Sequence, residues 1–342
     1  MAEGAHVYLA AVDEYLQRLL STPEATVEQL YGMMRYHMGW ADAALQPSQS
    51  AQGKRVRPLL CLLCCEAVGG RWREALPLAC GLELVHNFSL IHDDVEDGSA
   101  LRRHRPTVWS LWGVPQATNT GDAMFSLAHL AVHGLADLGL ACDVVLAILR
   151  RLEQACLALC EGQCLDIAFE ESQQVSISTY QRMISGKTAA LLACAAEAGA
   201  LVGSGLSGPH DLLAMFGREL GLAFQMVDDL LGIWGASAVT GKPEGDDLRS
   251  RKKTLPVLYA LEAMAERGDD RLARLMAQPA LAEAEVAAAI RLVEDSGARE
   301  RVVSLAQEHT ERALMALDQA VGPSPARDSL RALALSLVAR DR

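Results

Sequence analysis

Apolar residues recur along most of this chain three and four positions apart, which is the spacing of an α-helix, and alternation with a period of two is nearly absent. Alanine and leucine dominate the long stretches, whereas runs of β-branched residues are rare. Helix-breaking residues cluster at positions 22–23, 46–53, 69–70, 203–209 and 322–325. The pattern predicts helices of about 15–30 residues joined by short loops. Because no linker or repeat divides the chain, we expect one all-α domain over residues 1–342.

Composition narrows the class of protein. The 342 residues are 51% hydrophobic and 22% charged, which is enough apolar material for a sizeable core. A net charge of −12 argues against nucleic-acid binding. The most apolar run, residues 189–202, is interrupted by Glu197 and is shorter than the roughly 18–20 residues that span a bilayer. Residues 1–7 lack signal-peptide features, and nine cysteines then favour a reducing compartment. We expect a cytoplasmic protein without a membrane span.

Six cysteines fall into two groups, at positions 61, 64 and 65 and at positions 156, 160 and 164. The second group has the spacing of one helical face and could form a thiolate stripe. Neither group has the second CxxC or the His pair that a tetrahedral zinc site needs, and buried thiols behave as small hydrophobes. We expect both groups to pack in the core.

The strongest candidate for chemistry is the acidic run Asp93-Asp94-Val95-Glu96-Asp97, which ends an apolar stretch that begins near Leu78. On a helix, Asp93 and Asp97 lie one turn apart with Asp94 beside them. Like charges at this spacing repel, and a hard divalent cation such as Mg²⁺ relieves the repulsion. A solvated helix end would carry the same residues, so this run alone leaves both interpretations open.

A second acidic pair, Asp228-Asp229, lies at the end of another apolar stretch. Burying such a pair is costly unless a cation or a metal accompanies it. Each acidic segment is followed by a basic one, at residues 102–105 and 242–253, and further basic segments lie at 53–58 and 186–188. Because arginine and lysine bind phosphate, the sequence predicts a shared metal and diphosphate centre. The segment at 186–188 lacks the spacing and the preceding strand of a nucleotide-binding P-loop.

Together these segments resemble the trans-isoprenyl diphosphate synthases of the polyprenyl synthetase family, and geranylgeranyl diphosphate synthases most of all. The resemblance extends over residues 53–256 and leaves 257–342 as C-terminal packing helices. It rests on these motifs in family order: Gly53-Lys54-Arg55-Val56-Arg57-Pro58, Glu83-Leu84-Val85-His86, the first acidic run with Arg102-Arg103, Gly121-Asp122, Gly162-Gln163 with Asp166, Gly186-Lys187-Thr188, Phe224-Gln225 with Asp228-Asp229, Gly241-Lys242-Pro243, and Asp247-Leu248 followed by Lys252-Lys253-Thr254-Leu255-Pro256. It implies an all-helical isoprenoid-synthase bundle with a central active-site cavity, and a homodimer.

The resemblance also implies a role for each matching residue. Three Mg²⁺ ions would be ligated by Asp93, Asp97 and Asp228, with Asp94 and Asp229 as supporting members of the metal site. The allylic diphosphate would be held by Arg102, Lys187, Lys242 and Lys252, and isopentenyl diphosphate by Lys54, Arg57, His86 and Arg103. Thr188 and Gln225 would lie beside the developing allylic cation, where oxygen dipoles stabilise positive charge.

The implied reaction condenses isopentenyl diphosphate with an allylic prenyl diphosphate and releases diphosphate. Metal ions and basic side chains would neutralise the leaving group, and an apolar wall around Phe88 would exclude water. We expect the released diphosphate to take the final proton. His92 adjoins Asp93 and invites a general-base role, but we expect it to support or cap the site instead.

Phe88 and Ser89 are the fifth and fourth residues before the first acidic run, at positions that limit the growing tail in this family. A large residue followed by a small one resembles the synthases that stop at C20. We therefore expect geranylgeranyl diphosphate as the product, with C15 and C25 or longer left open.

The chain departs from the family pattern at Gly232, the fifth position of the second acidic motif, where many members have Asp, and at Ala236 in the loop that follows. We still expect the metal to be retained, because Asp228 is the main ligand expected there. Glu96 adds a carboxylate to the first motif, and we expect it to face solvent.

These departures leave two alternatives: a class I terpene cyclase that acts on a finished prenyl diphosphate, and a non-catalytic regulatory subunit of a prenyl synthase. The intact isopentenyl-binding set argues against the first, and the retained aspartates argue against the second.

Overall fold

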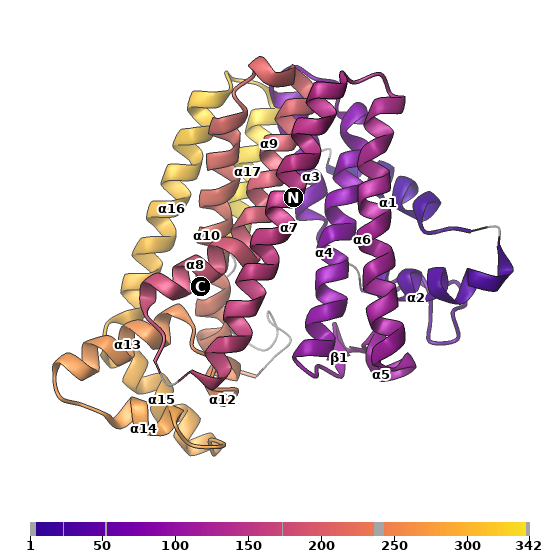
Figure 1. Ribbon diagram of the computed structural model, residues 1–342. Helices are drawn as coiled ribbons and strands as arrows, with labels where there is room; N and C mark the ends of the chain where they lie inside the picture. The colour runs from indigo at the N-terminus through magenta and orange to yellow at the C-terminus, as the bar shows by residue number, and fades with distance from the viewer. Residues whose placement is uncertain (1–4, 23, 52, 173, 236–242, 340–342) are drawn as a thin grey trace.

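Long helices lie side by side and form the body of the molecule in the computed structural model, which describes residues 5–22, 24–51, 53–172, 174–235 and 243–339 (Figure 1). The first half contains α1 (Ala5–Leu19), α2 (Glu28–Met38), α3 (Val56–Ala67), α4 (Leu76–Glu96), α5 (Val108–Trp112), α6 (Val114–Asp137) and α7 (Cys142–Glu171). The second half contains α8 (Ile177–Ile184), α9 (Ala190–Ser204), α10 (His210–Trp234), α12 (Asp246–Arg249), α13 (Leu255–Glu266), α14 (Arg271–Met276), α15 (Glu283–Asp295), α16 (Ala298–Ala320) and α17 (Pro325–Val338). Short 3₁₀ turns lie at Ala25–Val27, Trp72–Ala75 and Gly205–Ser207, and a π-helical turn at Ser185–Ala189 joins α8 to α9.

The prediction of an all-α fold is confirmed. The clusters of helix breakers at 46–53, 69–70, 203–209 and 322–325 fall at or between helix ends wherever the chain is described. Within the described residues, strands occur only in a two-stranded antiparallel hairpin, β1 (Leu101–Arg102) and β2 (Arg105–Pro106), apart from one isolated bridge between Ala41 and Pro47. The hairpin lies in the basic segment after the first acidic run. The end of α4, the hairpin, α5 and α12 lie at the same end of the bundle, the lower end in Figure 1.

Two apolar clusters fill the bundle, and α10 belongs to both. Phe216 and Leu220 pack with residues of α3, α4 and α9, whereas Met226 and Ile233, further along α10, pack with residues of α8, α13 and α16. Helix α4 is enclosed by its neighbours α3 and α6, and nearly all of its residues from 78 to 91 are buried. This enclosure explains why α4 is apolar around its whole circumference instead of along one stripe. Both acidic motifs therefore lie on helices that the core fixes in place.

One continuous helical stretch, residues 177–207, is long and apolar enough to cross a membrane by length and composition alone. Of its most apolar window, 67% is buried inside the bundle. The stretch includes α9, which packs against α3 and α10 and serves as a core helix.

The prediction that the cysteines pack in the core is confirmed for the first group, which is fully buried in α3, and is only partly right for the second. Cys156 is buried in α7, but Cys160 and Cys164 are exposed. Residues four apart are displaced by about 40° around a helix, so the row drifts off the buried face within two steps. At the level of Cys164 the buried face carries Gly162 and Gln163 instead.

A buried ion pair fixes the loop that leads from α2 into α3. Arg55 has a left-handed backbone conformation, with φ of 50°, directly before α3. Its Nη1 donates to Oε1 of Glu83 on α4 at 2.8 Å, and its Nε donates to Oδ1 of Asp13 on α1 at 3.3 Å. Asn87 also donates to Glu83 Oε1, at 3.0 Å. These contacts tie α1, α3 and α4 together beside the basic residues of the segment 53–58.

Because removing one partner of a buried pair leaves the other charge uncompensated, Glu83→Ala should lower the free energy of unfolding by about 3–5 kcal/mol. Asp270→Ala breaks the ion pair with Arg274, which lies on the surface with both side chains more than half exposed, and should have a much smaller effect. Urea unfolding of the two variants measures the difference. Equal losses of unfolding free energy in the two variants would show that the buried charge of Arg55 does not need Glu83 to compensate it.

Candidate active site

The first acidic motif occupies the last turn of α4. Asp94 is buried, Asp93 is half-buried, and Asp97 is exposed at the end of the helix. Burial raises the pKa of Asp93 to about 6; Lys187 opposes the shift and Asp97 adds to it. The ionised form of Asp93 is therefore under-neutralised, and a cation placed here would stabilise it.

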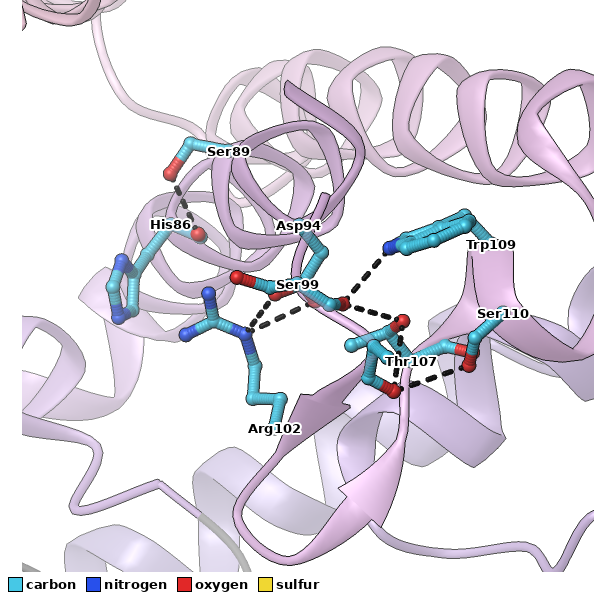
Figure 2. Close-up of polar contacts among 9 residues, drawn as sticks. His86, Ser89, Asp94, Ser99, Arg102, Thr107, Trp109 and Ser110 are labelled. Atoms are coloured by element: carbon cyan, nitrogen blue, oxygen red, sulfur yellow. Dashed lines mark hydrogen bonds and ion pairs between the residues drawn. The ribbon is translucent and has the colours of Figure 1, made fainter. Parts of the chain in front are cut away.

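Figure 2 shows how Asp94 is held. Arg102 of β1 donates its Nε to both carboxylate oxygens of Asp94, at 2.8 and 3.0 Å. The hairpin is tied in turn to the segment after α4, because Thr107 Oγ1 and Trp109 Nε1 donate to the carbonyl oxygen of Ser99, at 2.9 and 2.8 Å. Asp94 thus anchors Arg102 at the end of α4.

The second acidic motif lies within α10, which continues past Asp229 for more than a turn, to Trp234; the expectation that the pair ends its helix is wrong. Asp229 is buried and accepts hydrogen bonds from Tyr180 Oη at 2.6 Å, Gln225 Nε2 at 3.1 Å and the backbone N–H of Leu255 at 3.2 Å. Burial nevertheless raises its pKa to about 7. These three donors fix the orientation of Asp229, which together with Asp228 lines a cavity.

A hydrogen-bonded chain connects this motif to the π-helical turn. Gln225 donates its amide nitrogen to Asp229. Its Oε1 accepts a hydrogen bond from the Thr188 hydroxyl at 2.7 Å. Lys187, the preceding residue, donates its Nζ to Asp166 Oδ2 of α7 at 2.5 Å. These polar groups are therefore held in position by three elements: α7, α10 and the π-helical turn between α8 and α9.

Close contact between backbones places the π-helical turn against α7. A Cβ atom added to Gly162 would lie 2.3 Å from the backbone nitrogen of Lys187, and one added to Gly186 would lie 2.4 Å from the carbonyl oxygen of Ala158. Such a contact is impossible for any other residue type without a shift of the backbone. Glycine at both positions therefore lets Lys187 and Thr188 approach the cavity.

A cavity of about 1020 Å³ opens between α4, α7, α8, α10 and the segment around α12. Its acidic lining residues are Asp97, Asp166, Glu170, Asp228, Asp229, Asp246 and Asp247, and its basic ones are Lys54, Lys187, Arg251, Lys252 and Lys253. Nearby carboxylates, with Asp166 and Asp247 foremost, raise the pKa of Lys252 although burial opposes the shift. Lys253 donates its Nζ to the carbonyl oxygen of Phe169 at 2.5 Å. The raised pKa of Lys252 favours its charged form at the cavity wall.

The donor chemistry of this cavity fits magnesium. Among the described residues, no three His, Cys, Asp or Glu side chains converge into a preformed metal site. Carboxylates from α4 and α10 instead line one cavity together with lysines. Mg²⁺ is commonly bound in this way, through one or two carboxylates, retained waters and the phosphates of a substrate.

A separate group of arginine and histidine side chains lies beside the end of α4. The pKa of His86 is lowered far below its usual value, by burial first and then by Arg57, Arg103 and Arg102. His37 of α2 belongs to the same group: burial and the same two neighbouring arginines, 102 and 103, lower its pKa to about 3. Among the described residues, Arg57 Nε and His37 Nε2 are buried without a hydrogen-bond partner. An anion is the ligand that would neutralise and satisfy this group.

An aromatic pair lies behind the acidic turn of α4. Phe88 is buried and meets Phe125 of α6 edge-on, with ring centroids 5.0 Å apart. Ser89 is also buried, and its hydroxyl donates to the carbonyl oxygen of His86 at 2.9 Å (Figure 2). The pair joins α4 to α6, and nothing in the sequence marked Phe125. The wall that we expected around Phe88 stays a prediction.

The profile of the polyprenyl synthetase family matches residues 38–293. The chain belongs to this family. It is 44% identical over 298 residues to a geranylgeranyl diphosphate synthase of Mycobacterium tuberculosis, a match that covers 87% of this chain and 84% of the relative. It is also 44% identical over 282 residues to a (2E,6E)-farnesyl diphosphate synthase of Mycobacterium bovis, covering 81% and 77%.

A solved polyprenyl synthetase of Streptomyces coelicolor superimposes with a TM-score of 0.87 at 39% identity, covering 96% of this chain and 97% of that one. The family and these similarities confirm the enzyme class expected from the sequence, a trans-prenyl diphosphate synthase.

The structure adds contacts for several residues of this polyprenyl synthetase that the sequence alone does not show. His92 turns towards α6, where its Nε2 lies 3.3 Å from the carbonyl oxygen of Thr118. Glu96 is exposed as expected but also accepts a hydrogen bond from Gln163 at 2.8 Å. Lys242 lies outside the described residues. His37 and Tyr180 carry no motif, and only the tertiary structure brings them to the site.

The lowered pKa of His37 has a consequence for stability. Between its native value of about 3 and the ordinary value of 6.5, the unfolded chain binds a proton that the native chain does not, so the His37 contribution weakens as the pH falls below 6.5. The free energy of unfolding of His37→Gln, relative to that of the native enzyme, should therefore rise by roughly 1–2 kcal/mol as the pH is lowered from 6 to 4.5. One group can change it by at most about 1.4 kcal/mol per pH unit. Buried carboxylates titrate in the same range with the opposite sign, which is why the difference between the two proteins is measured.

Unfolding in urea at a series of pH values provides the measurement. His133, which is exposed on α6, supplies the control His133→Gln. Parallel curves for His37→Gln and the native protein would contradict the assignment of a neutral, buried His37.

Proposed function

We propose that this chain condenses isopentenyl diphosphate with an allylic prenyl diphosphate in a magnesium-dependent reaction and releases diphosphate. The observation that carries the proposal is the presence of two separate anion sites. The cavity combines carboxylates with lysines, and a second group, beside the end of α4, brings the guanidinium groups of Arg57 and Arg103 close to His86. A synthase that joins two diphosphate esters needs both sites, whereas a cyclase that ionises one ester needs only the first. A geranylgeranyl pyrophosphate synthase of Corynebacterium glutamicum, 27% identical with a TM-score of 0.82, is described as complexed with isoprenyl diphosphate and magnesium.

In the proposed mechanism, the allylic diphosphate is bound in the cavity by Lys187 and Lys252, with Arg102 and Lys242 as further expected contacts. Magnesium, held by Asp93, Asp97 and Asp228, would neutralise charge on the leaving diphosphate; three ions are expected. Asp94 and Asp229 support the site by orienting neighbouring groups. Lys187 is shared between Asp166 and the incoming ester, so its position is set before substrate binds.

Thr188 and Gln225 are proposed to stabilise the allylic cation. Because the Thr188 hydroxyl donates its proton to Gln225, its own lone pairs are left to face positive charge. Isopentenyl diphosphate would be held by Lys54, Arg57, His86 and Arg103, with its double bond towards the cation. The carbon–carbon bond then forms as the allylic carbon–oxygen bond breaks, and the released diphosphate takes the proton that the new chain loses.

The length of the product is proposed to be C20. The relatives do not decide it, because equally similar proteins carry the names of geranylgeranyl and farnesyl diphosphate synthases. The support comes from the bulk of Phe88, which packs edge-on against Phe125 before the acidic turn, and from the small Ser89 beside it.

We also propose that the enzyme is a cytoplasmic homodimer of single-domain subunits. The outer surfaces of α6 and α7 carry exposed leucines, Leu130 at 64%, Leu146 at 63% and Leu157 at 63%. Covering them would remove apolar area from water. Sedimentation equilibrium tests this, since a monomeric mass would contradict it.

The function is tested by incubating the purified protein with Mg²⁺ and allylic diphosphates of five, ten and fifteen carbons, with and without isopentenyl diphosphate. Mass analysis should show products longer by five carbons only when isopentenyl diphosphate is present. Arg103→Gln should raise the KM for isopentenyl diphosphate by about 10- to 100-fold, since a hydrogen bond to a charged group contributes about 1.5–3 kcal/mol. Arg267→Gln removes an exposed arginine and should not change it. Hydrocarbon formed from the allylic ester alone would identify a cyclase instead.

Product length is tested at the aromatic pair. Phe88→Leu and Phe88→Ala should progressively shift the main product beyond the native length, because each removes bulk behind the acidic turn. Phe216→Leu removes the same atoms from a fully buried position of α10 and should leave product length unchanged. Phosphatase treatment followed by chromatography of the alcohols gives the distribution. An unchanged distribution in both Phe88 variants would show that the floor lies elsewhere.

A further inference from the structure

At Gly232 the second acidic motif lacks its last aspartate, but the space beside this glycine is occupied. A Cβ atom built on Gly232 would lie 1.9 Å from Oδ2 of Asp247, 2.4 Å from its Cγ and 3.0 Å from its Oδ1. The carboxylate of Asp247, which comes from α12, therefore occupies the space where a side chain at position 232 would begin. Both residues line the cavity.

Position 232 lies one helical turn after Asp228, on the same face of α10. A carboxylate above Gly232 is thus a neighbour of the residue expected to ligate magnesium. It also belongs to the group of carboxylates that acts on Lys252, whose pKa Asp247 helps to raise. The negative charge missing from the sequence motif is therefore present at the cavity wall, supplied from another element.

The backbone holds Asp247 in this position. The N–H of Gly245, directly before α12, donates to the carbonyl oxygen of Ile233 at 2.9 Å, which fastens α12 to the end of α10. On the other side, the N–H of Lys252 donates to the carbonyl oxygen of Asp247 at 2.7 Å. Asp247 is therefore presented by a short helix that is bonded to α10 at its start and closed by a local turn at its end.

We propose that Asp247 replaces the missing fifth carboxylate of the second acidic motif and stabilises the magnesium–diphosphate complex from α12. Gly232 leaves room for the Asp247 carboxylate, which a side chain there would displace. The inference rests on the proposed function for its ligand, magnesium with a diphosphate, but assigns the carboxylate to a residue that the motif does not contain.

The test uses Mn²⁺ as the probe, titrated into the full-length protein in the presence of inorganic diphosphate and followed by electron paramagnetic resonance and calorimetry. Asp247→Asn keeps the shape of the side chain and removes its charge, and it should weaken Mn²⁺ binding by about 10- to 100-fold. Glu244→Gln is the matched control, because it removes one negative charge from an exposed residue three positions away and should leave binding unchanged.

A relocation variant provides the stricter test. Gly232→Asp with Asp247→Ala returns the carboxylate to α10 and should bind Mn²⁺ within about threefold of the native protein, a difference well below the tenfold step of 1.4 kcal/mol. Gly232→Asp alone should bind less well than this double variant, since the two side chains then compete for one place. Native-like binding by Asp247→Asn would overturn the proposal. So would a folded double variant, with native melting temperature, that binds as weakly as Asp247→Asn.

The outcome is separable from that of the proposed function. If the native protein binds Mn²⁺ with diphosphate and the variants rank as expected, the assignment of Asp247 stands even if no chain elongation is observed. If elongation is observed but the ranking fails, the function stands and Asp247 has only a structural role. In an active enzyme, Asp247→Asn should also raise the Mg²⁺ concentration for half-maximal rate, with little change in the KM for isopentenyl diphosphate.

Discussion

At two places in this enzyme, the fold holds ionisable side chains in surroundings that disfavour their charged forms. Burial raises the pKa values of Asp93 and Asp229, and burial together with arginines lowers that of His86. Both shifts disfavour the charged form, which is the form that a ligand of opposite charge would restore. The surrounding helices must therefore be stable enough to hold these groups together in the absence of that ligand. The apolar enclosure of α4, and the buried pair of Arg55 and Glu83 beside it, supply that rigidity.

The remaining parts of the site are positioned by contacts between backbones. Gly162 and Gly186 allow α7 and the π-helical turn to touch, and this contact determines how far Lys187 reaches into the cavity. A π-helical turn inserts an extra residue into a helix and re-aims the side chains that it carries. Here it lies directly between α8 and α9, where Thr188 has to face Gln225 of a different helix. The π-helical turn therefore accompanies the hydrogen bond between Thr188 and Gln225.

Much of the fold could be predicted from the sequence, because helical periodicity and the clusters of breakers are local signals. The acidic motifs could be found for the same reason, since Asp93 and Asp97 are close in sequence as well as in space. Contacts between distant segments could not be predicted. The exposure of Cys160 depends on which neighbours cover α7, and the involvement of His37 depends on α2 packing beside the arginines. Gly232 is the clearest case: read along the chain it is a lost carboxylate, and only the tertiary structure shows Asp247 over it.

The aromatic pair of Phe88 and Phe125 has a consequence for the divergence of this family. Its two rings come from different helices, and only one of them adjoins the acidic motif. If the proposed role of Phe88 holds, a substitution on α6 changes the bulk at this pair and leaves the aspartates of both acidic motifs the same. The two mycobacterial relatives, equally similar to this chain at 44% identity, carry the names of synthases with different products. Under the proposed role of Phe88, chain length would then depend on a residue of the facing helix as well as on the segment before the acidic motif.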